Sequence, residues 1–322
     1  MSGLSHELLA EIRRIEIVTR RLVNQQMAGQ YHSVFKGRGM SFDEVRQYFP
    51  GDDPRSIDWN VTARTGEPYV KTYVEERELT VMIMVDMSGS MAFGTVRHEK
   101  RRVAAIMAAM MAFSAISNGD RVGLVAFTDR IERYVPPKKG RKHVLRIIDE
   151  ILRFDPVGAG TDLGAALEFI GRVQRRKAVV FLVSDFLDAG YERPLHVTAR
   201  RHDLIPLTVI DPRELELPDL GLLLIEDAET GVIEALDTGS RRVRGDFAKK
   251  QSQRHAARLA DLRRYGVKPI EVSTQADNYA GPLVNYFRIR ASRRSLVGES
   301  ARFQILLRTP ESARIRPQSS SS

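Results

Sequence analysis

From residue 79 onward, apolar runs of strand length alternate with segments of helical periodicity. The apolar runs are 79–85, 122–127, 178–183, 204–210 and 267–272. Apolar residues recur every three or four positions in the helical segments, which are 99–117, 142–152, 163–174, 193–201, 247–265 and 279–288. Strands that alternate with helices form a parallel sheet covered by helices on both faces. The sequence therefore predicts a doubly wound, mostly parallel α/β domain.

Two further regions flank this predicted domain, which we place at residues 76–292 with a hairpin insertion near 220–236. Residues 1–75 should contain an N-terminal amphipathic helix, followed by a small β-rich or irregular region full of turn residues. The apolar stripe of that helix consists of Leu4, Leu8, Ile12, Ile15, Val18 and Leu22. Residues 293–322 form a C-terminal extension, and its serine-rich end is expected to be disordered.

Composition excludes several classes of protein. Hydrophobic residues make up 43% of the chain, enough for a real core. The 50 basic residues exceed the 41 acidic ones by nine, but they are spread along the chain and do not alone indicate nucleic-acid binding. Without cysteine there is no disulfide and no thiolate metal site. The apolar stretch 103–117 is too short to span a bilayer, so we expect a cytoplasmic protein with no membrane span.

Oxygen-bearing side chains follow three of the predicted structural segments. Asp86, Ser88 and Ser90 come directly after the first strand, Thr161 follows a glycine-rich loop, and Asp185 follows the strand 178–183. Ligands of doubly wound sheets bind at the carboxyl ends of the strands, where these residues should meet. Carboxylate and hydroxyl oxygens suit a hard cation, Mg²⁺ or Mn²⁺. The sequence thus predicts a metal site with ligands Asp86, Ser88, Ser90, Thr161 and Asp185.

The mix of ligands also indicates what such a cation would do. Hydroxyls are neutral, so the two aspartates at most balance a dication, and the coordination shell is left incomplete. A cation in this state accepts a carboxylate from another protein as its last ligand. We therefore expect a protein partner that presents a carboxylate to the metal.

At these five positions the sequence resembles the von Willebrand factor A domain. The metal-ion-dependent adhesion site (MIDAS) of that domain is built from Asp-x-Ser-x-Ser, a later threonine and a later aspartate. The resemblance covers roughly residues 79–290. It implies that the five residues are ligands of an adhesive metal site.

The upstream segment is similar to the bacterial domain of unknown function 58 family, in which it precedes a von Willebrand A-like domain. The matching residues are Gly37-Arg38-Gly39, Phe42, Arg46-Gln47-Tyr48, Pro50-Gly51-Asp52-Asp53, Arg55 and Ile57-Asp58-Trp59. The resemblance implies a cytoplasmic protein, often encoded beside a MoxR-type AAA+ ATPase. It also implies a chaperone-like adaptor role with that ATPase in the maturation of other proteins.

Enzymatic hypotheses find less support. The chain has neither the Gly-x-x-x-x-Gly-Lys-Ser/Thr phosphate loop nor the Gly-x-Ser-x-Gly nucleophile elbow. We therefore expect no enzyme. The remaining alternative is a metal-dependent phosphoester hydrolase, in which Asp162 or Asp188 would supply a further carboxylate near the metal. Asp162 stands at the start of a predicted helix and is expected to cap it.

Two other segments have both a structural and a functional interpretation. Residues 241–264 are rich in arginine and lysine, so a basic nucleic-acid-binding scaffold is a second alternative. Their spaced apolar residues favour a solvated surface helix, and we expect no nucleic acid as partner. The aromatic residues of 38–59 are expected to pin this segment against the sheet, with Trp59 in the core.

Overall fold

The computed structural model describes residues 41–74, 78–95, 99–158, 160–226, 231–276, 278–290 and 292, with eight single residues between 13 and 35. The apolar stripe predicted for the N-terminal helix and the C-terminal extension after residue 292 lie outside the described residues.

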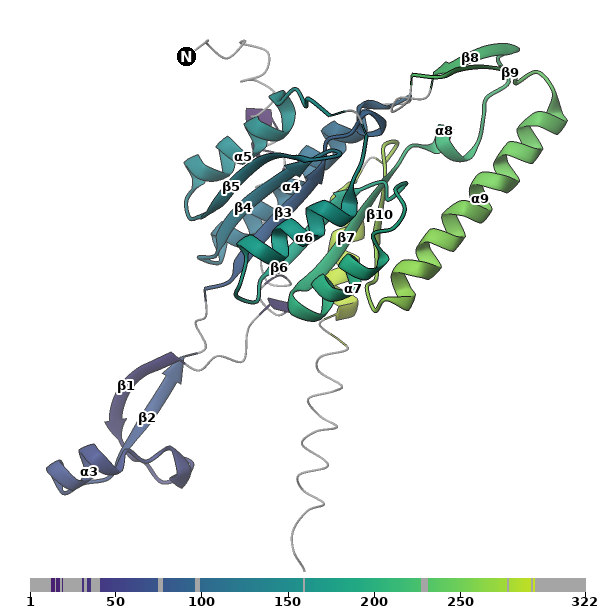
Figure 1. Cartoon of the computed structure of the whole chain (residues 1–322). Helices are drawn as coiled ribbons and strands as arrows, with labels where there is room; N and C mark the ends of the chain where they lie inside the picture. Colours follow the sequence, from purple (N-terminus) through teal and green to yellow (C-terminus); the bar gives the residue numbers. More distant parts are fainter. Residues whose placement is uncertain are drawn as a thin grey trace, which may run out of the picture.

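A six-stranded sheet forms the centre of the molecule (Figure 1). Its spatial order is β10 (Ile270–Ser273), β7 (Asp203–Ile210), β6 (Val179–Ser184), β3 (Thr80–Asp86), β4 (Arg121–Phe127) and β5 (Ile131–Lys138). All neighbouring strands are parallel except β4 and β5. The first strand of the sheet, β3, lies in the middle, and the chain builds outward from it in both directions. The predicted doubly wound, mostly parallel α/β fold is confirmed.

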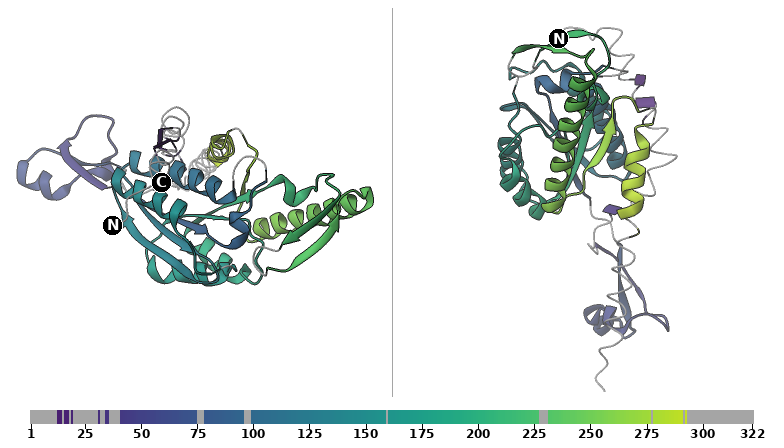
Figure 2. Two further views of the ribbon diagram at one scale, coloured as in Figure 1. Left: turned by 90° about the horizontal axis from the view of Figure 1, so that it is seen from above. Right: turned by 90° about the vertical axis from the view of Figure 1, so that its right-hand side faces the viewer.

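Helices cover both faces of this sheet (Figures 1 and 2). On one face lie α4 (Lys100–Ser117), α5 (Arg141–Arg153) and the helix 280–290; on the other lie α6 (Leu163–Val173) and α7 (Glu192–Arg201). Successive side chains of β3 point to opposite faces, so Ile83 joins one apolar cluster and Met82 and Met84 the other. Burial on both sides explains why the strands appear in the sequence as continuous apolar runs.

Strand β5 was not expected from the sequence. It contains Pro136 and Pro137, which cannot donate backbone hydrogen bonds and do not occur in the ladder pairing with β4. The strand occupies the edge of the sheet, where prolines are tolerated. Its position at the edge thus reconciles the two prolines with a strand.

Residues 41–74 form a separate small unit. Strands β1 (Ser41–Gln47) and β2 (Tyr69–Val74) pair antiparallel, and η2 (Pro54–Ser56) and α3 (Trp59–Thr65) lie between them. The Arg46 guanidinium donates to both oxygens of Asp52, at 2.8 and 2.7 Å. Figure 1 shows the unit apart from the sheet. Trp59 is 70% exposed at the start of α3, so the predictions that it is a core residue and that this segment is pinned to the sheet are wrong.

A further unit, which we call the inserted unit, lies between β7 and β10 in the chain. It consists of α8 (Pro212–Leu215), the antiparallel pair β8 (Leu222–Glu226) and β9 (Ile233–Asp237), and the long helix α9 (Arg241–Arg264). Helix α9 begins six residues before the predicted segment, and the Ser240 hydroxyl accepts a bond from the Val243 N–H at its first turn. Leu262 is its one fully buried residue.

Within the described part of the chain, we find no helix with the length and apolar character needed to cross a membrane.

Candidate metal centre

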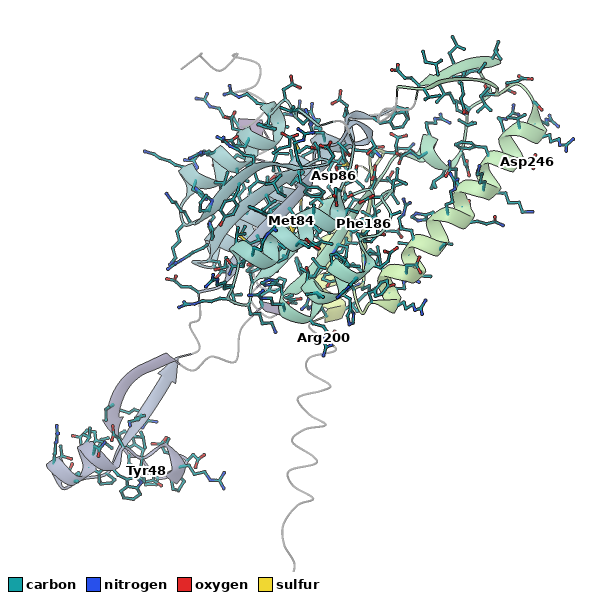
Figure 3. The ribbon with its side chains drawn as sticks, viewed as in Figure 1. Tyr48, Met84, Asp86, Phe186, Arg200 and Asp246 are labelled. Atoms are coloured by element: carbon teal, nitrogen blue, oxygen red, sulfur yellow. The ribbon has the colours of Figure 1, made fainter. Side chains whose placement is uncertain are left out.

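Asp86 lies at the carboxyl end of the central strand and is fully buried. Its Oδ1 accepts from the Ser88 N–H at 3.0 Å and from the Ser88 hydroxyl at 2.6 Å. The Ser88 and Ser90 hydroxyl oxygens are 3.1 Å apart. The structure therefore brings three of the five predicted ligands, Asp86, Ser88 and Ser90, into one hydrogen-bonded cluster. Asp86 is labelled in Figure 3.

The neighbouring strand β6 contributes to the same cluster through a residue that the sequence analysis did not single out. The hydroxyl of Ser184, the last residue of β6, donates to Asp86 Oδ2 at 2.7 Å. The Ser184 hydroxyl oxygen in turn accepts from the Phe186 N–H at 3.0 Å. A serine at the end of a fully apolar strand was the available signal, because a hydroxyl there needs a partner.

Burial and the negative charge of Asp185 raise the pKa of Asp86 to about 7, although bonds from Ser88 and Ser184 oppose the shift. Ionisation of Asp86 is therefore energetically unfavourable in the absence of a neighbouring cation. A cation bound there would favour the ionised form, so the electrostatics of Asp86 fit a metal ligand.

Asp185 follows β6 and is almost completely buried. Its Oδ2 accepts from the Lys100 ammonium at 2.8 Å, and its Oδ1 accepts from the Leu187 N–H at 3.3 Å. The next residue, Phe186, has φ of 56°, the left-handed conformation that is rare for a bulky side chain. Among described residues other than glycine it alone has a positive φ. Such strain is typical of sites where the backbone must aim a side chain.

Lys100, the first residue of α4, is the main feature that sequence reasoning missed. Its side chain is fully buried and pairs with both Asp185 and Glu214 of α8. Burial alone would lower the pKa of Lys100, but the two carboxylates raise it above the usual value. The available signal was a cation at a helix N-terminus, where the helix dipole disfavours positive charge and a carboxylate partner is needed.

Glu214 ties this ion pair to α8. The Glu214 side chain accepts from the Asp211 N–H at 3.0 Å, and the Asp211 side chain accepts from the Arg213 N–H at 2.9 Å, which is a capping box. Asp211 also accepts from the Thr95 and Thr274 hydroxyls, at 2.6 and 2.8 Å. Hydrogen bonds thus lead from Asp185 to the start of the inserted unit.

Thr161 lies in the loop before α6 and is half-buried. The next residue anchors this loop, because the Asp162 N–H donates to the Thr128 carbonyl at 2.9 Å. Thr128 directly follows Phe127, the residue of β4 that pairs with Asp86. Thr161 is therefore placed at the carboxyl ends of the strands, as the Asp86 cluster is. The Asp162 carboxylate accepts from the Ala165 N–H at 2.7 Å and caps α6, which confirms its predicted structural role.

The donor set fits a hard dication in its chemistry. Among the described residues, no group of three or more histidine, aspartate or glutamate side chains could hold a metal. A cation at the carboxyl ends of these strands would therefore need hydroxyl oxygens as ligands in addition to Asp86 and Asp185. With Asp86 ionised, as a bound cation would favour, the three carboxylates of Asp86, Asp185 and Glu214 would face the single positive charge of Lys100, and the remaining double negative charge would match a dication.

Comparison with known proteins gives the family. The model of the family described as "Protein of unknown function DUF58" matches residues 44–257. The chain belongs to the DUF58 family. Uncharacterised proteins of Mycobacterium bovis and Mycobacterium tuberculosis are each 34% identical to this DUF58 chain over 291 residues, which cover 89% of it and 90% of each relative. An uncharacterised Mycobacterium avium protein is 34% identical over 160 residues, 48% of this chain and 93% of that protein.

Solved structures similar to this DUF58 protein include BatB from Bacteroides thetaiotaomicron and the VWA domain of SpRpn10. The BatB match has 15% identity and a TM-score of 0.42, and it covers 67% of this chain and 99% of that one. The SpRpn10 match has 10% identity and a TM-score of 0.37, and it covers 64% and 94%.

Proposed function

We propose that this DUF58 protein is a metal-dependent protein-binding module. Asp86, Ser88, Ser90, Thr161 and Asp185 would hold Mg²⁺ or Mn²⁺ in a MIDAS-like arrangement. When bound, the dication supplies the positive charge that attracts a carboxylate of the partner protein. The observation that carries the proposal is the cluster of Asp86, Ser88 and Ser90 at the end of the central strand, with Asp185 directly after the adjacent strand β6.

The contacts of Lys100 support an open coordination site. The Lys100 ammonium competes with a cation for Asp185 Oδ2, whereas Oδ1 accepts only the longer bond from the Leu187 N–H and is the more available oxygen for the cation or its water. Lys100 also neutralises part of the negative charge around the site. The serine hydroxyls add none, so a dication bound here keeps the electrophilic character that an incoming acidic side chain requires.

The contacts of the nearby carboxylates favour a binding module over the hydrolase alternative. The hydrolase alternative needs Asp162 or Asp188 as a further acidic group at the metal. Asp162 accepts from the Ala165 N–H at 2.7 Å, and Asp188 accepts from the Leu163 N–H at 2.8 Å. Each already holds a backbone N–H at the N-terminus of α6, so a role as base would compete with this contact to the helix.

The proposal extends to the partner and the compartment. The resemblance of the upstream segment to DUF58 sequences supports a MoxR-type AAA+ ATPase as partner in a cytoplasmic, chaperone-like maturation process. This part of the proposal rests on the resemblance alone, whereas the acidic chemistry of the partner's contact residue follows from the site.

The test is capture of proteins from the native lysate by the immobilised chain in the presence of Mg²⁺, compared with capture after chelation by EDTA. We expect a set of proteins, including an AAA+ ATPase, that is retained with Mg²⁺ and released by EDTA. The Thr161→Ala variant should retain less of them, since it loses one neutral ligand, and this loss should be milder than that of an aspartate variant.

Two results would count against this function. Identical capture with Mg²⁺ and with EDTA would remove the role of the metal. Turnover of a phosphoester by the purified protein with Mg²⁺ or Mn²⁺, lost in Asp86→Ala, would favour the hydrolase.

A further inference from the structure

The inserted unit divides into one strongly acidic and one strongly basic stretch. Residues 214–240 contain no lysine or arginine but eight acidic residues, which are Glu214, Glu216, Asp219, Glu226, Asp227, Glu229, Glu234 and Asp237. The following helix α9 contains nine basic residues against Asp246 and Asp261. Such blocks of opposite charge, one directly after the other, are typical of interaction surfaces.

The acidic stretch also carries an exposed apolar face. In the hairpin of β8 and β9, Leu224 pairs with Ala235 and Glu226 pairs with Ile233, so these side chains share one face. On this face Leu222, Leu224 and Ile233 are 72%, 74% and 62% exposed. Six of the thirteen exposed large hydrophobic residues in the described part of the chain lie within 220–233. Apolar surface concentrated in this way marks a contact site.

The outward face of α9 is basic, so its charge is complementary to that of the acidic hairpin. Its exposed residues include the basic Arg242, Lys249, Lys250 and Arg264, with the small Ala256, Ala257 and Ala260 between them. A helix of 24 residues is ~36 Å long, and a strand of five residues is ~17 Å long, so the hairpin is short enough to lie along it.

Apart from the pairs of Glu214 with Lys100 and of Arg242 with Asp246, few of these charges are paired within the described part of the chain. The one ion pair between the described parts of the hairpin segment and α9 joins Asp219 and Arg244 at 3.0 Å. Glu226 and Asp237, on the same face as Leu222 and Leu224, form no ion pair with another described residue, and the same holds for Lys249 and Lys250. The exposure of Leu222 and Leu224 shows that the chain's own α9 does not cover the apolar face.

We propose that the hairpin of one copy packs on the outward face of α9 in a second copy, so that the protein forms a homodimer in which this contact occurs twice. The acidic rim of the hairpin would pair with the lysines and arginines of the partner's helix, and its leucines would lie on the alanines. Packing hairpin on hairpin would oppose like charges. An anionic lipid surface would likewise repel the acidic hairpin, and charge complementarity therefore selects the helix of a second copy.

Charge reversal tests this contact. One variant carries Glu226→Lys and Asp237→Lys on the docking face of the hairpin, and a second carries Lys249→Glu and Lys250→Glu on α9. In sedimentation velocity, we expect the wild type to be a dimer and each variant alone to dissociate at least tenfold more readily. An equimolar mixture of the two variants should restore the dimer, because both contacts are then complementary again.

The matched control for the α9 variant is Arg193→Glu with Arg200→Glu on α7, two exposed positions with the same change in net charge, and it should remain a dimer. Arg200 is labelled in Figure 3. Circular dichroism confirms that each variant is folded. A wild type that sediments as a monomer throughout would overturn the proposal. So would a mixture of the two variants that stays monomeric, or association that is lost in Leu222→Glu but kept in the α9 variant. None of these results depends on the metal site.

Discussion

Asp86→Asn is expected to lose Mg²⁺ binding while the protein stays folded. The substitution removes the charge at the centre of the serine cluster but keeps the size of the side chain and one acceptor oxygen. Affinity should fall by more than the roughly 10- to 100-fold that accompanies loss of an outer partner of a metal site. Isothermal titration with Mg²⁺ measures this loss. The free energy of unfolding should change little, because the substitution also removes a buried carboxylate whose charge is costly.

A matched control is Asp149→Asn on α5, where the carboxylate pairs with Arg153 one helical turn away and is not among the proposed ligands. This variant should bind Mg²⁺ as the wild type does. Wild-type affinity in Asp86→Asn would contradict the assignment of Asp86 as a ligand. Global unfolding of Asp86→Asn would show instead that Asp86 has a structural role.

Lys100→Met should destabilise the fold more than any substitution at the metal ligands. Removing the ammonium leaves Asp185 buried without its partner and Glu214 without its ion pair. Breaking a buried ion pair by deleting one member costs about 3 to 5 kcal/mol. Urea denaturation should therefore show a loss of about 3 kcal/mol in the free energy of unfolding.

A double variant separates this effect from lost packing. Lys100→Met combined with Glu214→Gln leaves one unpaired charge fewer than Lys100→Met alone. The loss of unfolding free energy in the double variant should therefore be smaller than the sum of the losses in the two single variants. The control is Lys139→Met, which breaks the exposed pair with Glu78 and should change stability little. If Lys100→Met is as stable as the wild type, the ion pair does not hold the site together.

The sequence was sufficient to predict the parts of the fold that depend on periodicity. The parallel strands are buried on both faces, so each of them is a continuous apolar run between helical segments. Strand β5 was missed because its two prolines resemble a loop, and only its place at the edge makes them acceptable. Trp59 was assigned to the core because tryptophan is mostly buried, but the small unit that carries it does not cover its ring.

At the site, the spacing of residues along the chain was enough to predict the ligands that follow strands. It gave no sign of the residues whose role depends on long-range contacts. Asp86, Ser88 and Ser90 are adjacent in sequence, and their cluster could be anticipated from a turn at the end of a strand. The roles of Lys100 and Glu214 depend on contacts between residues 114 positions apart. Such a contact is set by how α4 and α8 dock on the sheet, which no local pattern encodes.

Diffraction from crystals soaked with Mn²⁺ shows whether a dication binds between the Asp86 cluster and Asp185. We expect one strong anomalous peak at the carboxyl end of β3, at ligand distance from the Ser88 and Ser90 hydroxyl oxygens, and no such peak in crystals of Asp86→Asn. A map of wild-type crystals at saturating Mn²⁺ with no peak at these hydroxyls, or with a peak only elsewhere, would contradict this expectation.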